Sequence, residues 1–351
     1  MATGIEFSLK QRGRACVDFL TYLALGGTGV RGRAEALVDM RFSDLDALPE
    51  DLDERHELIE GVMVKERAYR AEQLLGEWHS RQHGVVADAA FEEVRDTLEP
   101  RLRQLDQGSA TLELDANFVA PRYWDGVKFH RTEKMWDDSD YSGCVHGEII
   151  HRKMVDRLYP GGIFKQRRAV AAMAPRDSYT KILEMGCSTG HFTVALAQSY
   201  PEAEIHGIDL SHRTLEHTRR VANALGQPWK LYQRPAEDTG FATDSFDLVA
   251  SYILLHEMPG DIIRRVFAEA FRVLEPGGDM IMSDVTRYAD LDKLAEWRAD
   301  RGARYGGEPH WRSAASLDLA EAARDAGFEQ VFAGAEPPMK YPYVVRGSKP
   351  Q

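Results

Sequence analysis

The pattern that most constrains the fold begins at about Asp177, where short apolar runs rich in β-branched residues alternate with longer amphipathic runs. The pairs are KILEM with HFTVALAQSY, EIHGIDL with RTLEHTRRVANALG, and FDLVASYILL with IIRRVFAEAFRVL. Such alternation is typical of parallel strands joined by crossover helices. The sequence therefore predicts an α/β fold with an open sheet, and ligands of such sheets bind at the carboxyl edge of the strands.

The first half of the chain has a different periodicity. Its segments ERHELIEGVMVKERAYRAEQLLGEW and DAAFEEVRDTLEPRLRQLD carry apolar residues three and four positions apart, which predicts amphipathic helices. A chain of 351 residues is long enough for two domains. We therefore expect a mainly helical N-terminal domain over residues 1–165 and a sheet domain over residues 166–351, divided where the periodicity changes.

Composition narrows the class of partner. The net charge of −12 would repel phosphate backbones, so we expect no nucleic acid. No apolar stretch approaches the ~18–20 residues that cross a bilayer, and the first residues lack the apolar core of an export signal, so we expect no membrane contact and a cytoplasmic location. Cys16, Cys144 and Cys187 lie far apart, which predicts free thiols and no metal site. A small molecule is the expected partner.

The segment ILEMGCSTGHFT places Gly186 and Gly190 in a turn between a strand and a helix. Glycine tolerates a positive φ there and lets a ligand approach the backbone. Ser188 occupies the position of the middle glycine in a dinucleotide fingerprint, the residue that admits a pyrophosphate. Glu184 ends the strand, where its carboxylate would repel a pyrophosphate and attract an ammonium group. The turn therefore favours a ligand that is cationic at this point.

Further acidic residues follow the next two strand candidates. Asp209 ends EIHGIDL and is placed to accept hydrogen bonds from both hydroxyls of a ribose. Glu237 and Asp238, in AEDTGF, are placed to accept a hydrogen bond from an adenine amino group. Carboxylates at three successive strand ends indicate a nucleoside-like ligand.

With these motifs the sequence resembles the class I S-adenosylmethionine-dependent methyltransferases over roughly residues 165–348. The matching segments are EMGCSTG, GIDLS, AED, FDLVASYILLHEMP and RVLEPGGDMIMSD. The resemblance implies a seven-stranded Rossmann-like sheet and S-adenosyl-L-methionine as cofactor. It assigns the methionyl part to Glu184, Gly186, Ser188 and Gly190, the ribose to Asp209, and the adenine to Leu210, Glu237 and Asp238, with Ser251 as a further cofactor contact.

Two residues are candidates for the chemistry. His256 and Glu257 follow the strand FDLVASYILL at the same edge of the sheet, and histidine suits a general base. The segment SYILLHEMP is similar to the place where small-molecule O-methyltransferases, which have a helical N-terminal dimerisation domain, carry a catalytic histidine. It also resembles methyltransferases of ubiquinone and menaquinone biosynthesis, in which this histidine is often structural. Both roles for His256 stay open.

The candidates for substrate contact are aromatic. Trp136 and Tyr141 lie in the aromatic-rich stretch before the sheet domain and fit either a pocket wall or packing between the domains. Tyr305 lies in RYGGEPHW, which fits either a cover over the substrate or an exposed loop. Arg167 and Arg168 precede the first strand of the sheet and fit either a cofactor carboxylate or a solvated surface.

We therefore expect an S-adenosylmethionine-dependent methyltransferase that acts on a small organic molecule, with O-methylation favoured over S-, C- or N-methylation. A homodimer through the N-terminal half is expected from the resemblance. A protein that binds S-adenosylmethionine for a reaction other than methyl transfer is one alternative. An NAD(P)-dependent oxidoreductase is another, which Ser188 and Glu184 disfavour.

Overall fold

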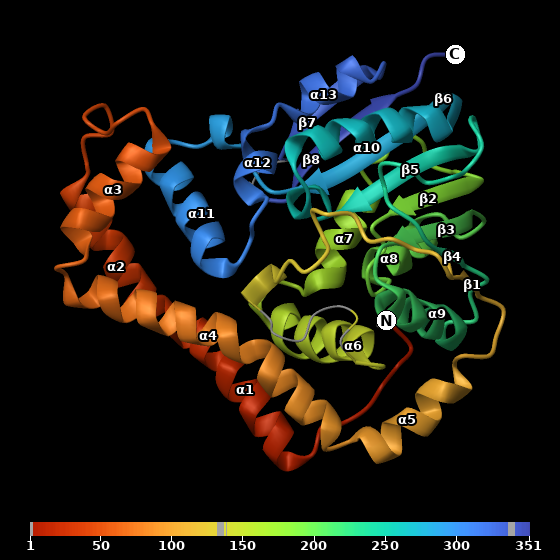
Figure 1. Ribbon diagram of the computed structural model, residues 1–351, viewed down its shortest axis with the longest axis horizontal. Helices are drawn as coiled ribbons and strands as arrows, with labels where there is room; N and C mark the ends of the chain where they lie inside the picture. The colour runs from red at the N-terminus through yellow and green to blue at the C-terminus, as the bar shows by residue number, and fades with distance from the viewer. Residues whose placement is uncertain (1–2, 132–136, 138, 336–340) are drawn as a thin grey trace.

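The computed structural model describes residues 3–131, 137, 139–335 and 341–351, and its centre is an eight-stranded sheet (Figure 1). The strand order is β1-β4-β3-β2-β5-β6-β8-β7. β8 is antiparallel to its neighbours β6 and β7, and the other pairs are parallel. The strands are β1 (Thr111–Glu113), β2 (Lys181–Met185), β3 (Glu204–Asp209), β4 (Lys230–Gln233), β5 (Phe246–Tyr252), β6 (Leu274–Asp284), β7 (Glu329–Gly334) and β8 (Tyr343–Ser348).

The Rossmann-like arrangement is confirmed, but the expected count of seven strands is wrong. The additional strand is β1, which pairs with β4 at the edge of the sheet. With three residues, TLE, it is too short to show a strand periodicity in the sequence. Residues on both sides of position 165 therefore contribute to one sheet.

Helices cover both faces of this sheet (Figure 1). The side chains of successive strand residues point to opposite faces, so neighbouring apolar residues of β2 enter different cores. Ile182 belongs to a core with residues of α8 and α9, and Leu183 to a core with residues of α10 and α13. The two layers consist of α7 (Ile163–Ala171), α8 (His191–Ser199) and α9 (His212–Ala224) on one face and α10 (Gly260–Val273) and α13 (Leu319–Asp325) on the other.

The N-terminal half is mainly helical, as predicted. Four helices form an extended arm on one side of the molecule, a fifth lies below the sheet domain, and further helical turns lead from there to the sheet (Figure 1). The arm comprises α1 (Gln11–Gly26), α2 (Thr28–Arg41), α3 (Leu52–Met63) and α4 (Arg67–Glu92), and the fifth helix is α5 (Arg95–Gln104). The turns are η1 (Phe129–Arg131), α6 (Ser142–Cys144), η2 (Val145–Met154) and η3 (Val155–Leu158).

One helix from the second half packs against this arm. α11 (Lys293–Gly306) follows η5 (Tyr288–Asp290), and its Trp297 is buried in a core with Ile59 of α3. Arg55 of α3 is also buried, and its Nη1 donates to Glu296 Oε2 at 2.6 Å. After α11 the chain returns to the sheet through α12 (Trp311–Ser316). α11 thus joins the arm to the second half of the chain, and a separate core brings Val17 of α1 and Phe91 of α4 together with Ile182 of β2.

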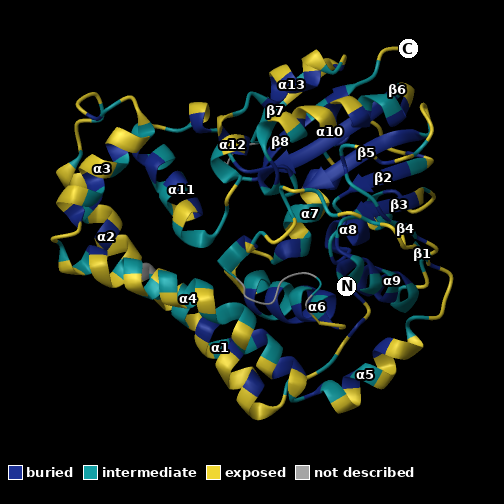
Figure 2. Ribbon diagram, in the orientation of Figure 1, coloured by how far each residue is buried: buried dark blue, intermediate teal, exposed yellow. Residues whose placement is uncertain are grey.

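Strand residues are mostly buried, whereas the outer sides of α1 and α4 are exposed (Figure 2). Within the described part of the chain, every helix is too short or too polar to cross a lipid bilayer.

Candidate active site

The glycine-containing turn after β2 has the backbone geometry that its sequence predicts. Gly186 and Gly190 have φ of +70° and +82°, and Ser188 between them has φ of +47°. A Cβ atom on Gly186 would lie 2.6 Å from Leu254 Cδ1, so a side chain at this position would collide with the segment that follows β5. The backbone N–H of Ser188 donates to Asp209 Oδ2 at 2.8 Å, which ties the turn to the end of β3.

Two cavities meet at this turn, with volumes of about 210 and 100 Å³. Both are lined by Gly186, Ser188, Ile253 and Glu257. Ile253 follows β5 and has φ of +56°, a strained conformation for a β-branched residue that is typical of functional sites. The two cavities together have the size of a small-molecule site and lie at the carboxyl edge of the parallel strands.

Glu184 lines the first cavity and is almost fully buried. Its Oε2 has no hydrogen-bond partner among the described residues. Burial raises the pKa of Glu184 to about 8. A buried carboxylate whose oxygen is unsatisfied is costly unless a ligand supplies a donor or a positive charge. The site therefore fits an ammonium group at Glu184.

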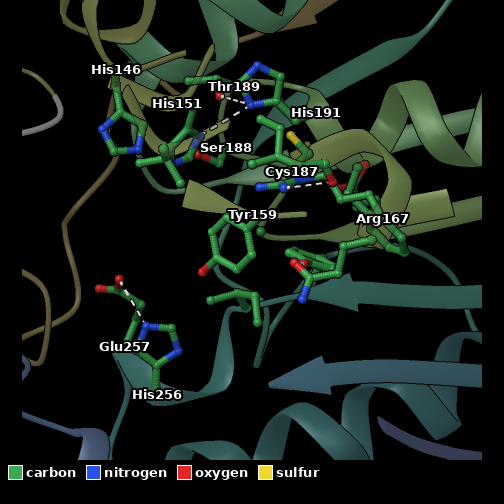
Figure 3. Close-up of a pocket in the computed structure, with 18 of the residues that line it drawn as sticks. His146, His151, Tyr159, Arg167, Cys187, Ser188, Thr189, His191, His256 and Glu257 are labelled. Atoms are coloured by element: carbon green, nitrogen blue, oxygen red, sulfur yellow. Dashed lines mark hydrogen bonds and ion pairs between the residues drawn. The ribbon is translucent and has the colours of Figure 1, made fainter. Parts of the chain in front are cut away.

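Arg167 of α7 lines the same cavity, and its guanidinium lies 4.6 Å from the centre of the Tyr252 ring. Its buried Nε has no partner among the residues described, while Nη1 donates to Ile163 O at 3.3 Å. Figure 3 shows Arg167 on the same side of the cavity as Cys187. Arg168 is exposed. The Arg167 guanidinium can pair with a ligand carboxylate, and the Glu184 carboxylate can pair with a ligand ammonium group. Together they match the two charged groups of an amino acid.

Asp209 lines the second cavity with Leu210. Burial raises the pKa of Asp209 to about 6, although backbone donors at Ser211 and Ser188 oppose this shift. Its Oδ1 accepts from the N–H of Ser211 at 2.9 Å. Each carboxylate oxygen has two lone pairs, so Asp209 can still accept hydrogen bonds from a diol.

Other predicted cofactor residues lie outside the cavities. Glu237 accepts a hydrogen bond from Tyr123 Oη at 2.8 Å, and Tyr123 rather than Glu237 lines the second cavity. Asp238 is exposed, and Ser251 is fully buried within β5. Gly190 lies at the N-terminus of α8, against Thr218. The residues that line this end of the second cavity are Tyr123, Trp124, Arg234, Ala236, Leu254 and Met258.

His256 lies on η4 (Leu255–Glu257) and lines the first cavity, where Figure 3 shows it beside Glu257 and across from Ser188. Its Nδ1 lies 3.0 Å from Asp284 Oδ1, and its Nε2 lies 3.7 Å from Glu257 Oε1. Burial alone would lower the pKa of His256, but the adjacent Asp284 carboxylate outweighs burial and raises it to about 9. The Asp284 carboxylate also accepts from the N–H of Leu255 at 2.6 Å, so it fixes the turn and the imidazole together.

Four further histidines line the first cavity, and of these only His130 lies in the aromatic-rich stretch for which a pocket wall was one of the two expected roles. His151 Nδ1 lies 3.2 Å from His191 Nδ1, and burial lowers the pKa of both imidazoles well below the ordinary range. His146 stacks near His151 with ring centres 4.3 Å apart. His130 lies in an ion-pair cluster with Glu257 and Glu308. No sequence motif marks three of the four, which lie in the segment before the sheet domain: His130, His146 and His151. His191 directly follows the glycine turn, so its position next to the cofactor turn could have been predicted from the sequence.

The predicted substrate residues are not brought together. Trp136 lies outside the described residues. Tyr141 is buried against Phe91, with ring centres 5.3 Å apart, and it lines neither cavity. Its position is therefore that of a packing residue and not of a pocket wall. Tyr305 lies on α11, facing Arg301 and His56, and lines neither cavity.

Comparison with known proteins identifies the sheet domain. Residues 182–278 match a family described as a methyltransferase domain. A ubiquinone/menaquinone biosynthesis C-methyltransferase from Desulfotalea psychrophila is 32% identical over 120 residues, covering 34% of this chain and 47% of that protein. A malonyl-[acyl-carrier protein] O-methyltransferase from Legionella pneumophila is 33% identical over 150 residues, covering 43% of this chain and 48% of that protein. The chain thus spans about half the length of these curated relatives.

A solved O-methyltransferase family protein from Burkholderia thailandensis has a similar fold, with a TM-score of 0.51 at 14% identity over 82% of this chain and 74% of that one. S-adenosylmethionine is the cofactor of the methyltransferase family. The site fits this cofactor at three points. Glu184 would bind its ammonium group, Arg167 its carboxylate, and Asp209 its ribose diol. Residues 182–278 thus match a methyltransferase domain, in agreement with the resemblance of the sequence to the class I S-adenosylmethionine-dependent methyltransferases.

Proposed function

We propose that this protein transfers the methyl group of S-adenosylmethionine to an oxygen atom of a small organic acceptor. The observation that carries the proposal is the pair of cavities that meet at Gly186, Ser188 and Glu257. The second cavity has the Asp209 carboxylate, which would hold the ribose of the adenosine. The first cavity holds Glu184 and Arg167 for the methionyl end and has His256 on its opposite side, where an acceptor would lie.

When bound, the cofactor supplies an electrophilic methyl group on a sulfonium. The chain's part is to hold the acceptor oxygen in line with that methyl group, and such positioning alone reaches effective molarities of up to ~10⁵–10⁸ M. An acceptor hydroxyl must also lose its proton. Asp284 holds His256 Nδ1, which leaves Nε2 as the nitrogen that would take this proton. Because the adjacent Asp284 carboxylate raises the pKa of His256 to about 9, the imidazole is protonated at neutral pH, and its contribution as a base should increase as pH rises toward 9. Glu257, 3.7 Å from Nε2, is the second candidate.

The acceptor atom is tested by incubating the protein with isotopically labelled S-adenosylmethionine and matched hydroxyl, thiol and amine acceptors. We expect label in hydroxyl acceptors together with formation of S-adenosylhomocysteine. Label in thiol, amine or carbon acceptors alone would replace O-methylation by S-, N- or C-methylation. Cofactor binding without S-adenosylhomocysteine under any condition would favour a reaction other than methyl transfer.

Asp209→Ala should weaken S-adenosylmethionine binding by at least tenfold, because the ribose would lose a charged hydrogen-bond acceptor worth roughly 1.5–3 kcal/mol. Asp238→Ala is the matched control, since Asp238 is exposed and lines neither cavity. Isothermal titration calorimetry of both variants measures the effect. Equal losses in the two variants would favour the adenine contact that the sequence assigns to Asp238, and unchanged affinity in Asp209→Ala would remove the ribose site.

We also propose that the N-terminal arm mediates homodimerisation. Phe19 of α1 and Trp78 of α4 are 58% and 45% exposed and pack edge to face with ring centres 6.4 Å apart. Tyr22 and Leu74 extend the same exposed apolar surface. Sedimentation velocity of the full chain should give a dimer, and Trp78→Glu should give a monomer of unchanged fold. A monomeric parent protein would overturn this proposal.

A further inference from the structure

Three side chains that are distant in the sequence form a compact cluster beside the first cavity. His130 Nδ1 lies 2.6 Å from Glu308 Oε1, and His130 Nε2 lies 3.4 Å from Glu257 Oε1. One ligand atom from each of the three residues can be chosen so that all three atoms lie within 4.8 Å of one another. The cluster joins η1, η4 and the loop between α11 and α12.

The backbone holds His130 in place for this cluster. His130 has φ of +54°, a left-handed conformation that is uncommon for a residue other than glycine. Its N–H donates to Gly307 O at 2.9 Å, on the residue next to Glu308. Strained positions of this kind persist where the surrounding structure determines them and are common at ligand sites. The imidazole and the Glu308 carboxylate are therefore fixed to each other through the main chain as well as through their side chains.

The spacing is close to that of a metal site. Bonds of about 2.1 Å from zinc to nitrogen and oxygen place ligand atoms roughly 3–3.5 Å apart in a tetrahedral or octahedral shell. Small side-chain rotations would bring the three atoms from within 4.8 Å to that separation. Glu308 Oε2 is buried and has no hydrogen-bond partner among the described residues, so the cluster retains an unused oxygen ligand.

The donor set and the surroundings indicate which ion would bind. One imidazole with two carboxylates and no thiolate suits divalent first-row transition metals better than soft ions such as Cu(I). His130 and Glu257 both line the first cavity, so unfilled coordination positions would face the acceptor. His256 Nε2 lies 3.7 Å from Glu257 Oε1, and Asp284 holds the other ring nitrogen, so His256 can orient the Glu257 carboxylate from outside the cluster.

We propose that His130, Glu257 and Glu308 bind one divalent first-row transition-metal ion, and that this ion binds the acceptor oxygen at the first cavity. The second part rests on the proposed methyltransferase function. The ion would polarise the acceptor hydroxyl and orient it toward the methyl group. The sequence does not predict a metal site here, because the three ligands have none of the close spacings of metal-binding motifs.

The metal alone is the first probe. Calorimetric titration of the full chain with Mn²⁺ and with Zn²⁺, with Mg²⁺ as a harder ion for comparison, should show one Mn²⁺ or Zn²⁺ per chain and weaker Mg²⁺ binding. Glu308→Gln and His130→Asn should each weaken Mn²⁺ binding at least tenfold. Asparagine is chosen at position 130 because it tolerates a left-handed backbone. Glu77→Gln is the matched control, since Glu77 binds the neighbouring Arg131 and lies outside the cluster. It should bind Mn²⁺ as the parent does.

Pulsed electron paramagnetic resonance of Mn²⁺ bound to the unaltered protein should detect a coupled imidazole nitrogen, which tests the site even where a variant fails to fold. The absence of stoichiometric binding, or Mn²⁺ without a coupled nitrogen, would show that the cluster is an ion-pair network around a protonated His130. Titration of the same preparation with S-adenosylmethionine separates the two proposals. Cofactor binding without metal would overturn only the metal site, and metal binding without cofactor would overturn only the methyltransferase function.

Discussion

Glu184→Gln is expected to weaken S-adenosylmethionine binding by at least 100-fold. The carboxylate of Glu184 is almost fully buried, and its Oε2 has no partner among the described residues, so the cofactor's ammonium group would be its main counter-charge. Removing one partner of a buried ion pair typically costs about 3–5 kcal/mol, because the other charge stays buried and uncompensated. Calorimetry at pH 8 measures the loss. Glu202→Gln, on the surface after α8, is the control and should bind as the parent does.

The same substitution should remove a pH dependence. Because burial raises the pKa of Glu184 to about 8, the free protein carries a protonated Glu184 at pH 6 to 7 and must release that proton to bind the ammonium group. Affinity of the parent should therefore rise by up to about tenfold per pH unit over this range and level off near pH 8. The Glu184→Gln variant should show a flat profile. A parent affinity independent of pH would contradict an ammonium contact at Glu184.

Stability should change in the opposite direction. A carboxyl group whose pKa is raised by folding favours the folded state only while it is protonated, so this contribution is lost as pH rises from the unfolded value toward 8. Glutamine stays neutral. In the absence of cofactor, Glu184→Gln should therefore melt at a higher temperature than the parent at pH 8, with a smaller difference at pH 5. A residue that is unfavourable for the free protein and necessary for the ligand is typical of a binding site.

His256→Ala is expected to lower the turnover number by about 10²-fold or more while leaving S-adenosylmethionine affinity within twofold. General acid–base groups typically contribute 10²–10⁴-fold, and His256 lines only the first of the two cavities. His56→Ala is the control, because His56 lies on α3 and lines neither cavity. A His256→Ala variant that turns over as the parent does would leave the histidine with a structural role, as in the second family type that the sequence resembles.

The site residues that the sequence places at the cavities lie at or just after the ends of strands. Gly186, Ser188 and Asp209 follow directly from where two strands end, and the carboxyl ends of parallel strands must meet at one edge. The same reasoning does not extend to residues that lie away from a strand end. Asp238 lies in a turn whose direction no periodicity specifies, and it points to solvent. Ser251 lies one residue before the end of β5 and is buried within the sheet.

The part that sequence does not predict is brought together from distant segments. His130 and Tyr123 lie in the aromatic-rich stretch for which a pocket wall was one of two expected roles, but the stretch has no hydrophobic period that would place them. Tertiary contacts position it, such as the hydrogen bond from His130 N–H to the Gly307 carbonyl. β1 was missed for a similar reason, because three residues form a strand only when an edge is available for pairing. Tyr141 and Tyr305 show that aromatic composition alone does not separate a pocket wall from a packed core.

The most direct test of the cofactor assignment is calorimetric titration of the full chain with S-adenosylmethionine, S-adenosylhomocysteine and NAD in parallel. We expect micromolar binding of the first two and no heat from NAD, because Glu184 would repel a pyrophosphate where it attracts an ammonium group. Binding of NAD without binding of S-adenosylmethionine would contradict the assignment of both cavities and leave only the fold.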